Sequence, residues 1–333
     1  MNGYKQQAQN DYNGLLWIKK FLWLRSYELG MLLWQHDEKW SRTRADRVIR
    51  SWSKRGLVIL RELPERQGHA VFLSHKGAEF LTNAGVDAKS GKDVGTIIDK
   101  TWQPPNDWKH HLLNSAVLAW LHQLGNRILP EHEIKSTTSG LKKIPDGLVH
   151  NGSYCYLLET EQSRKSGPHL RHLVQTIIEF ARHGRESIAG LRVTHVLIAY
   201  VEKTHDERGH QLDHRKRIEA AIEKMLKGRI SITWMKCDMR KTFPVQFSGE
   251  ICVYMCPKTR RILHILDEHK WQACENDWGQ PAQCSHYGKT DVMLYQSRVD
   301  TWSIQISSRK RCYEANSFEE AKEVAAAWLA HVT

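Results

Sequence analysis

A short apolar segment interrupted by an Asn-Gly turn most constrains how this chain can fold. Residues 148–158 read Leu-Val-His-Asn-Gly-Ser-Tyr-Cys-Tyr-Leu-Leu, and Asn-Gly between apolar runs is typical of a tight β-hairpin. Asp146 comes just before the first run, and Glu159 and Glu161 follow the second. Residues two apart in a strand point to the same face, so the two glutamates share a face. The pattern therefore predicts two neighbouring strands with three carboxylates at one end.

Three carboxylates at one strand end suggest a metal site. Crowded carboxylates repel one another unless a cation or a proton joins them. Oxygen ligands of this kind suit Mg²⁺ or Mn²⁺. We therefore interpret the cluster as a metal-dependent site that cleaves phosphodiester bonds. The alternative is an edge hairpin whose acids face solvent.

The distribution of charge favours a polyanionic partner. The chain of 333 residues has a net charge of +12; residues 1–85 and 86–240 contribute +6 each, and residues 241–333 are neutral. No apolar stretch approaches the ~20 residues that span a bilayer, and the first residues lack the apolar core of a signal peptide. We expect a cytoplasmic bacterial protein with no membrane segment.

The cysteines are expected to be reduced thiols. There are seven, an odd number at irregular spacing, which is typical of a reducing compartment. Cys256, Cys274, Cys284 and His286 contain no C-x₂-C pair, so we do not expect a structural zinc site among them.

Residues 1–85 have the pattern of a winged helix-turn-helix domain. After two apolar-periodic segments, Ser41 is expected to cap a third helix that ends at Gly56. Strands over residues 57–60 and 70–73 would then flank the wing. The expected buried stripe of the third helix is Ala45, Val48, Ile49 and Trp52. Its remaining surface is basic, with Arg42, Arg44, Arg47, Arg50, Lys54 and Arg55.

This basic helix is predicted to bind double-stranded DNA. A helix fits the major groove, and arginine side chains reach phosphates and guanine edges. A solvated basic helix in a protein-interaction domain is the alternative, and the number of arginines on one helix favours DNA.

A polar segment and then an alternating order of elements follow. Residues 86–107 are rich in residues that interrupt helices and strands, such as glycine and proline, and are expected to form a linker. Residues 108–240 predict an αβββαβ domain with an αβ extension. The expected helices cover residues 108–124, 169–183 and 215–226, and the expected strands cover residues 131–135, the runs beside Asp146 and Glu159, 193–200 and 230–235.

This order resembles the PD-(D/E)XK nuclease superfamily. A winged helix followed by such a domain is most similar to the replication-relaxation/MobC family of plasmid mobilisation proteins, over about residues 12–236. The segments that carry the resemblance are Gly-His-Ala-Val-Phe-Leu-Ser-His-Lys-Gly at 68–77, His-His-Leu-Leu-Asn at 110–114, Pro-Asp-Gly at 145–147 and Leu-Glu-Thr-Glu at 158–161.

The resemblance implies a ligand set for Mg²⁺ (or Mn²⁺). Asp146, Glu159 and the carbonyl of Thr160 match the metal ligands of the superfamily, whereas Glu161 stands where most members have lysine. That lysine orients the nucleophile and offsets negative charge.

Basic and polar residues nearby are candidates for the missing role. Lys165 or Arg164 could replace the lysine, and Gln175 on the next helix could contact the nucleophile or phosphate. Adjacent helix residues point about 100° apart, so at most one of His110 and His111 faces the site, and we take His111 as the candidate. Glu133 is a further ligand candidate.

The resemblance also implies a function. It points to a site-specific and strand-specific endonuclease, a relaxase-like nickase that acts at a plasmid transfer origin with accessory mobilisation or coupling proteins. A non-catalytic accessory factor or repressor with a degenerate nuclease fold is the alternative.

Residues 241–333 are expected to form a small α+β appendage. The segment Ser-Phe-Glu-Glu at 317–320 predicts a capping box, and the helix after it is expected to turn Val324, Ala327, Trp328 and His331 to one face. Arg309, Lys310 and Arg311 could contact DNA, but the neutral charge favours an adaptor role toward a protein partner or a second copy.

Overall fold

The computed structural model is a mixed α+β protein with several separate sheets. It describes residues 3–34, 38–138, 143–152, 154–162, 167–183, 187–193, 195–201, 213–226, 229–237, 248–255, 264, 266, 271–275, 281–287, 290–298, 301–306, 311–315 and 317–332. The chain divides into two compact units. The first comprises Met1–Arg164, His183–His214 and Thr233–Glu250, and the second comprises Lys165–Arg182, Arg215–Ile232 and Ile251–Thr333.

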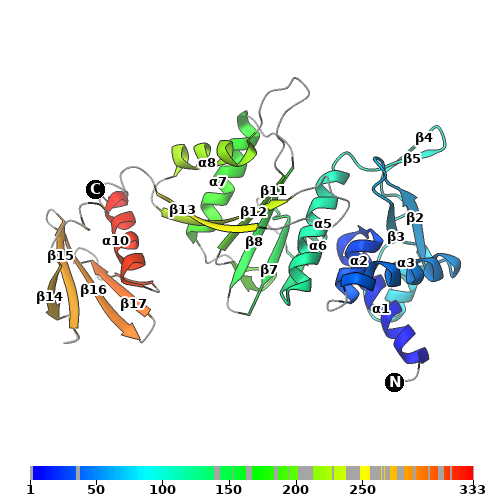
Figure 1. Cartoon of the computed structure of the whole chain (residues 1–333), viewed down its shortest axis with the longest axis horizontal. Coiled ribbons are helices and arrows are strands. Elements are labelled where there is room, and N and C mark those ends of the chain that lie inside the picture. Colours follow the sequence, from blue (N-terminus) through cyan, green and yellow to red (C-terminus); the bar gives the residue numbers. More distant parts are fainter. Residues whose placement is uncertain are drawn as a thin grey trace. The chain divides into compact units, whose positions relative to one another are not determined.

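The first unit begins with helices and a small antiparallel sheet (Figure 1). The helices are α1 (Gly3–Phe21), α2 (Ser26–Leu33), α3 (Glu38–Lys54) and α4 (His75–Asn83). The strands β1 (Trp23–Leu24), β2 (Val58–Glu62) and β3 (His69–Leu73) lie in the order β1-β3-β2.

The basic helix α3 starts earlier than its sequence predicts. Ser41 is buried inside α3 rather than capping it. It lies where α3 crosses α2 closely, because a Cβ added at Gly30 would come within 2.8 Å of the Ser41 carbonyl. The predicted stripe is confirmed for Ala45, Ile49 and Trp52, which are buried.

The segment predicted to be a linker contains a hairpin. Strands β4 (Thr96–Ile98) and β5 (Thr101–Gln103) pair across Asp99 and Lys100, whose φ angles are 49° and 64°. Two consecutive positive φ angles are what a type I′ turn requires. The Trp102 indole N–H donates to the Val94 carbonyl at 2.9 Å. Residues 86–107 therefore have structure of their own.

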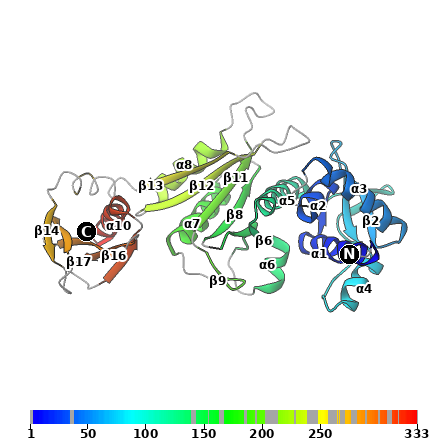
Figure 2. The same ribbon diagram turned by 60° about the horizontal axis from the view of Figure 1, so that its bottom comes forward.

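A six-stranded sheet follows, in the order β13-β12-β11-β8-β7-β6 (Figure 2). Its strands are β6 (Arg127–Pro130), β7 (Gly147–His150), β8 (Cys155–Glu161), β11 (His195–Val201), β12 (Arg229–Cys237) and β13 (Ser248–Met255). The predicted hairpin is confirmed, since β7 pairs antiparallel with β8. Strand β11 runs parallel to β8, and β13 belongs to this sheet although the sequence assigned it to the appendage.

Helices and two short strands accompany this sheet. They are α5 (Trp108–Gln123), α6 (Glu131–Thr137), α7 (Gly167–His183), α8 (His214–Met225), β9 (Ser187–Ile188) and β10 (Leu191–Arg192). The strand predicted over residues 131–135 is wrong, because β6 ends at Pro130 and the helix α6 begins at Glu131. Glu131 in the first turn pairs with Lys135 four residues later at 2.6 Å, an arrangement that favours a helix.

One hydrophobic core runs through the first unit. Leu29 of α2, Trp52 of α3, Val117 of α5 and Leu158 of β8 belong to the same buried cluster. The predicted boundary at residues 86–107 therefore does not separate two independent cores.

The C-terminal part forms an antiparallel sheet and one helix. The strands β14 (Gln272–Glu275), β15 (Pro281–Tyr287), β16 (Thr290–Arg298), β17 (Thr301–Ile306) and β18 (Arg311–Ala315) lie in sequence order, and α10 (Phe318–Val332) follows. The Glu320 N–H donates to the Ser317 hydroxyl at 3.1 Å, as the capping box predicts.

The core of this part uses Ala321, Ala325, Ala326 and Leu329 of α10, and Val324 of the expected face packs against it. The side chains of Trp328 and His331 lie outside the described residues. The prediction of reduced cysteines is wrong for Cys274 and Cys284, which form a disulfide because their neighbouring strands bring them together. Cys155 and Cys237 are thiols. Cys256, Arg309, Lys310 and the side chains of His286 and Arg311 lie outside the described residues.

Candidate metal centre and basic helix

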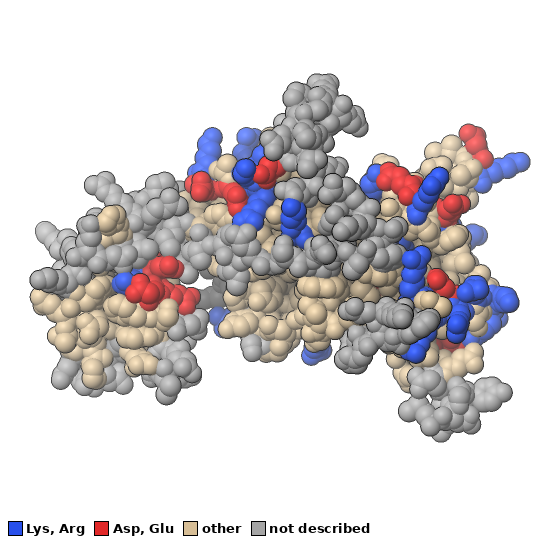
Figure 3. Space-filling model, viewed as in Figure 1, with Lys and Arg blue, Asp and Glu red and all other residues tan. Residues whose placement is uncertain are grey.

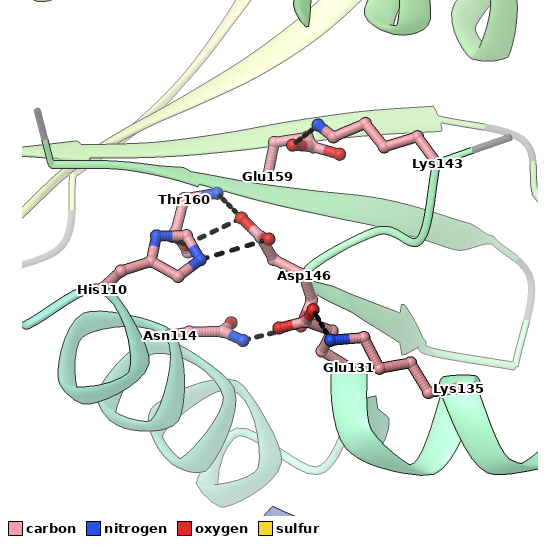
Figure 4. Close-up of polar contacts among 8 residues, drawn as sticks. All are labelled: His110, Asn114, Glu131, Lys135, Lys143, Asp146, Glu159 and Thr160. Carbon is pink, nitrogen blue, oxygen red and sulfur yellow. Dashed lines mark hydrogen bonds and ion pairs between the residues drawn. The ribbon is translucent and has the colours of Figure 1, made fainter. Parts of the chain in front are cut away.

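Three elements meet at Asp146. The β7–β8 register places Gly147 opposite Leu158, so Asp146, one residue before β7, comes level with the end of β8. His110 and Asn114 lie four residues apart on α5 and therefore share a face of that helix. Helix α5 packs against β7 and β8, and Figure 4 shows both α5 side chains directed toward Asp146.

Hydrogen bonds from the chain fix the Asp146 carboxylate. Oδ2 accepts the Thr160 backbone N–H at 2.6 Å and the Thr160 hydroxyl at 2.8 Å. Oδ1 lies 3.2 Å from Nε2 of His110. The Asp146 carbonyl accepts the Asn114 amide at 2.7 Å and the Glu131 N–H at 3.2 Å. Both the side chain and the backbone of Asp146 are therefore held in place.

The pair of Asp146 and His110 favours its charged form. Burial alone would raise the pKa of Asp146, but His110, the Thr160 N–H and Lys143 outweigh it and lower that pKa. Burial alone would lower the pKa of His110, but Asp146 outweighs it and raises that pKa. In each case burial is the largest single effect on the pKa, and the hydrogen bonds and opposite charges together outweigh it.

Glu131 completes a set of metal-ligand types. Ligand atoms of His110, Glu131 and Asp146 all lie within 4.8 Å of one another. Glu131 itself pairs with Lys135 (Figure 4). One imidazole and two carboxylates are donors that divalent metals accept, so the residues present fit such an ion.

Glu159 lies beside this set with a different partner. It is 1% exposed and forms an ion pair with Lys143. Burial and then the charge of Asp146 raise the pKa of Glu159 to about 8, although Lys143 opposes this. Its Oε1 has no hydrogen-bond partner among the described residues. A buried carboxylate oxygen without a partner is free to accept a cation or a proton.

The predicted ligand set is therefore only partly brought together. Asp146 is central, but the metal-ligand types grouped with it are His110 and Glu131, and Thr160 donates its N–H and hydroxyl to Asp146. Glu161 is buried at the end of β8 and does not belong to the set within 4.8 Å. No feature of the sequence singles out Lys143. Glu131 could have been identified from the pairing of Pro130 with Gly147, because this pairing places Glu131 level with Asp146.

His111 is not at the site, which corrects the prediction. Its ring stacks on Trp23 with centroids 4.3 Å apart, and its Nε2 lies 3.1 Å from the Trp23 carbonyl. Burial lowers the pKa of His111 to about 4. The turn of the α-helix directs His110 rather than His111 toward Asp146, because adjacent residues point about 100° apart.

Two of the remaining candidates form contacts of their own. Glu133 is on α6 and forms an ion pair with Lys20 at 3.1 Å. Gln175 is exposed on α7, in the second compact unit, and its amide donates to Glu179 at 3.3 Å. Arg164 and Lys165 lie outside the described residues.

The basic surface of α3 is exposed. Figure 3 shows lysine and arginine side chains gathered over this helix. The exposed members are Arg42, Arg44, Arg47, Arg50, Lys54 and Arg55. Arg55 forms an ion pair with Asp11 at 2.7 Å. The other oxygen of Asp11 accepts the Trp52 indole N–H at 2.6 Å, so Arg55 also has a structural role.

Comparisons with known proteins give one distant structural match. No family model matches the chain, and no curated protein matches it. A solved structure of SfsA from Pyrococcus furiosus in complex with Ca²⁺ is similar over 41% of this chain, with 12% identity and a TM-score of 0.26. The match spans 62% of SfsA. A likeness this distant identifies neither a family nor an activity.

The part of the chain that the structure describes has no helix long and apolar enough to cross a lipid bilayer.

Proposed function

We propose that this chain binds double-stranded DNA through α3, as a winged-helix domain would, and cuts one DNA strand with a divalent cation at Asp146. The observation that carries the proposal is the constellation around Asp146 within the same compact unit as the basic helix. The resemblance to replication-relaxation/MobC proteins makes a plasmid transfer origin the proposed target, with accessory mobilisation or coupling proteins as partners.

The residues at the site suit phosphodiester chemistry. The donor set would hold the cation, which when bound would polarise a scissile phosphate and promote ionisation of the attacking group. Thr160 and Asn114 keep Asp146 in position. His110 would be one of the ligands, as a neutral imidazole. Lys143 supplies positive charge beside Glu159, as stabilisation of a phosphoryl transition state requires.

A plasmid-relaxation assay tests this function. Supercoiled plasmid that carries the DNA flanking the gene for this protein is incubated with the full chain and Mg²⁺ or Mn²⁺. We expect nicked circles, which Asp146→Asn should abolish while DNA affinity stays unchanged. Asp99→Asn, the same change at the exposed β4–β5 turn, is the matched control and should keep full activity. Equal nicking by wild type and Asp146→Asn would reject the assignment.

One observation favours a second candidate, a DNA-binding accessory factor or repressor without cleavage. Lys143 pairs with Glu159 and Lys135 pairs with Glu131, so the acids have internal cations even before any metal binds. Tight binding to the flanking DNA, with no nicking in either metal, would favour this candidate.

A further inference from the structure

We propose that His110, Glu131 and Asp146 form a metal site that prefers a transition metal of the Mn²⁺ type over Mg²⁺, and that Lys135 takes the place of the metal at Glu131 when none is bound. The proposal rests on the proposed function and names its metal class and ligands. It differs from the ligand set expected from the sequence, in which Glu159 and the Thr160 carbonyl accompany Asp146.

The three donors are close to binding distance. Ligand atoms bonded to one ion at about 2.1 Å lie at most about 4.2 Å apart. The corresponding atoms here lie within 4.8 Å of one another, so shifts of a few tenths of an ångström would bring them to an ion. The donors come from the α5 helix, the start of β7 and the first turn of α6, and all belong to one compact unit.

The site has supporting residues of the kind that metal centres require. The Thr160 N–H and hydroxyl both hold Oδ2 of Asp146, which leaves Oδ1 on the side of His110. Asn114, buried on α5, and the Glu131 N–H hold the Asp146 carbonyl. Partners that orient ligands in this way commonly affect metal affinity 10- to 100-fold. The hydrogen bonds around Asp146 are of the kind that orient the ligands of a metal centre.

The imidazole decides the choice of metal. Mg²⁺ takes oxygen ligands almost exclusively and keeps much of its water, whereas transition metals accept imidazole nitrogen readily. A set with His110 as one of three donors therefore discriminates against Mg²⁺. With Glu131 and Asp146 as oxygen donors, Mn²⁺ satisfies both ligand types.

Lys135 is easily displaced. Its ion pair with Glu131 joins side chains that are 51% and 32% exposed. Exposed pairs of this kind contribute little free energy, which corresponds to at most about a fivefold change in an equilibrium constant. A divalent ion can therefore replace Lys135 at Glu131 with little loss.

Calorimetric titration of the full chain without DNA tests the site. We expect wild type to bind Mn²⁺ at least tenfold more tightly than Mg²⁺. His110→Gln should lower Mn²⁺ affinity at least tenfold and Mg²⁺ affinity less than threefold, and Glu131→Gln should weaken both. Lys135→Gln should raise Mn²⁺ affinity up to about fivefold. His132→Gln, next to Glu131 on α6 but outside the set, is the matched control and should match wild type.

A spectroscopic measurement complements the titration. Bound Mn²⁺ should show a ¹⁴N coupling in electron spin-echo spectra of wild type, and Glu131→Gln should retain it in whatever fraction still binds. Because the Glu131 side chain is partly exposed, Glu131→Gln should stay folded even if His110→Gln unfolds. Binding of Mn²⁺ without nitrogen coupling, or an unchanged Mn²⁺ affinity in His110→Gln, would overturn the inference.

The outcomes separate this inference from the proposed function. Nicking that runs equally well in Mg²⁺ and survives His110→Gln, but not Asp146→Asn, would uphold the function and reject the site. Metal binding as described, with no nicking of any DNA, would uphold the site and reject the function.

Discussion

The buried carboxyl of Glu159 should make the stability of the first unit fall as pH rises. Its pKa is raised from 4.5 to about 8, because burial and the charge of Asp146 oppose ionisation. A carboxyl that ionises more easily in the unfolded chain binds fewer protons there than in the folded state. The contribution of the protonated Glu159 carboxyl to the free energy of unfolding is therefore fully present below pH 4.5 and is lost as pH rises through about 8.

The magnitude follows from the two pKa values. Each pKa unit corresponds to about 1.4 kcal/mol, so the rise from 4.5 to about 8 gives a loss of at most about 5 kcal/mol between acid and alkaline solution. Glu159→Gln removes this ionisation and keeps the shape of the side chain. The variant should lose much less stability than wild type over the same range.

Hydrogen exchange reports this locally. The peptide that contains β8 is followed by mass spectrometry between pH 5 and 9, with rates corrected for intrinsic exchange, so that opening of β8 is measured separately from the second unit. Glu62→Gln, an exposed glutamate on β2, is the control and should follow wild type. If wild type and Glu159→Gln lose protection in parallel, the burial of an unfavourable charge at Glu159 is refuted.

Two further predictions concern the basic helix. Arg44→Ala should lower affinity for the cognate DNA by about 1–3 kcal/mol if the side chain contacts a base; fluorescence anisotropy measures this, and Arg61→Ala, on β2, serves as the control for a general loss of charge. An unchanged affinity would remove Arg44 from the interface. Trp52→Phe should lower the free energy of unfolding by about 1–3 kcal/mol, because Asp11 loses its buried indole partner; urea unfolding measures it, and no change would mean that Asp11 finds another donor.

The sequence located much of the secondary structure because the information is local. The Asn-Gly turn between apolar runs fixes the β7–β8 hairpin, and the spacing of Ala45, Ile49 and Trp52 fixes the buried face of α3. The same local patterns predicted a strand where the helix α6 lies, because the charged segment that begins with Glu131 has no apolar periodicity to distinguish a helix from a strand.

The geometry of the site depends on contacts between distant segments, which a local sequence pattern does not contain. The choice between His110 and His111 is set by the rotation of α5 against β8, which only packing defines. Glu131 approaches Asp146 because β6 pairs with β7, and Lys143 reaches Glu159 across a separation of sixteen residues.

The sequence alone thus determined that carboxylates gather at the end of a β-hairpin and that a basic helix precedes them, since both follow from residue spacing along one element. The tertiary structure decided which groups surround Asp146 and that the helices at the start of the chain share a core with the central sheet. Those outcomes depend on how distant segments pack, and packing is a property of the whole unit rather than of any stretch of sequence.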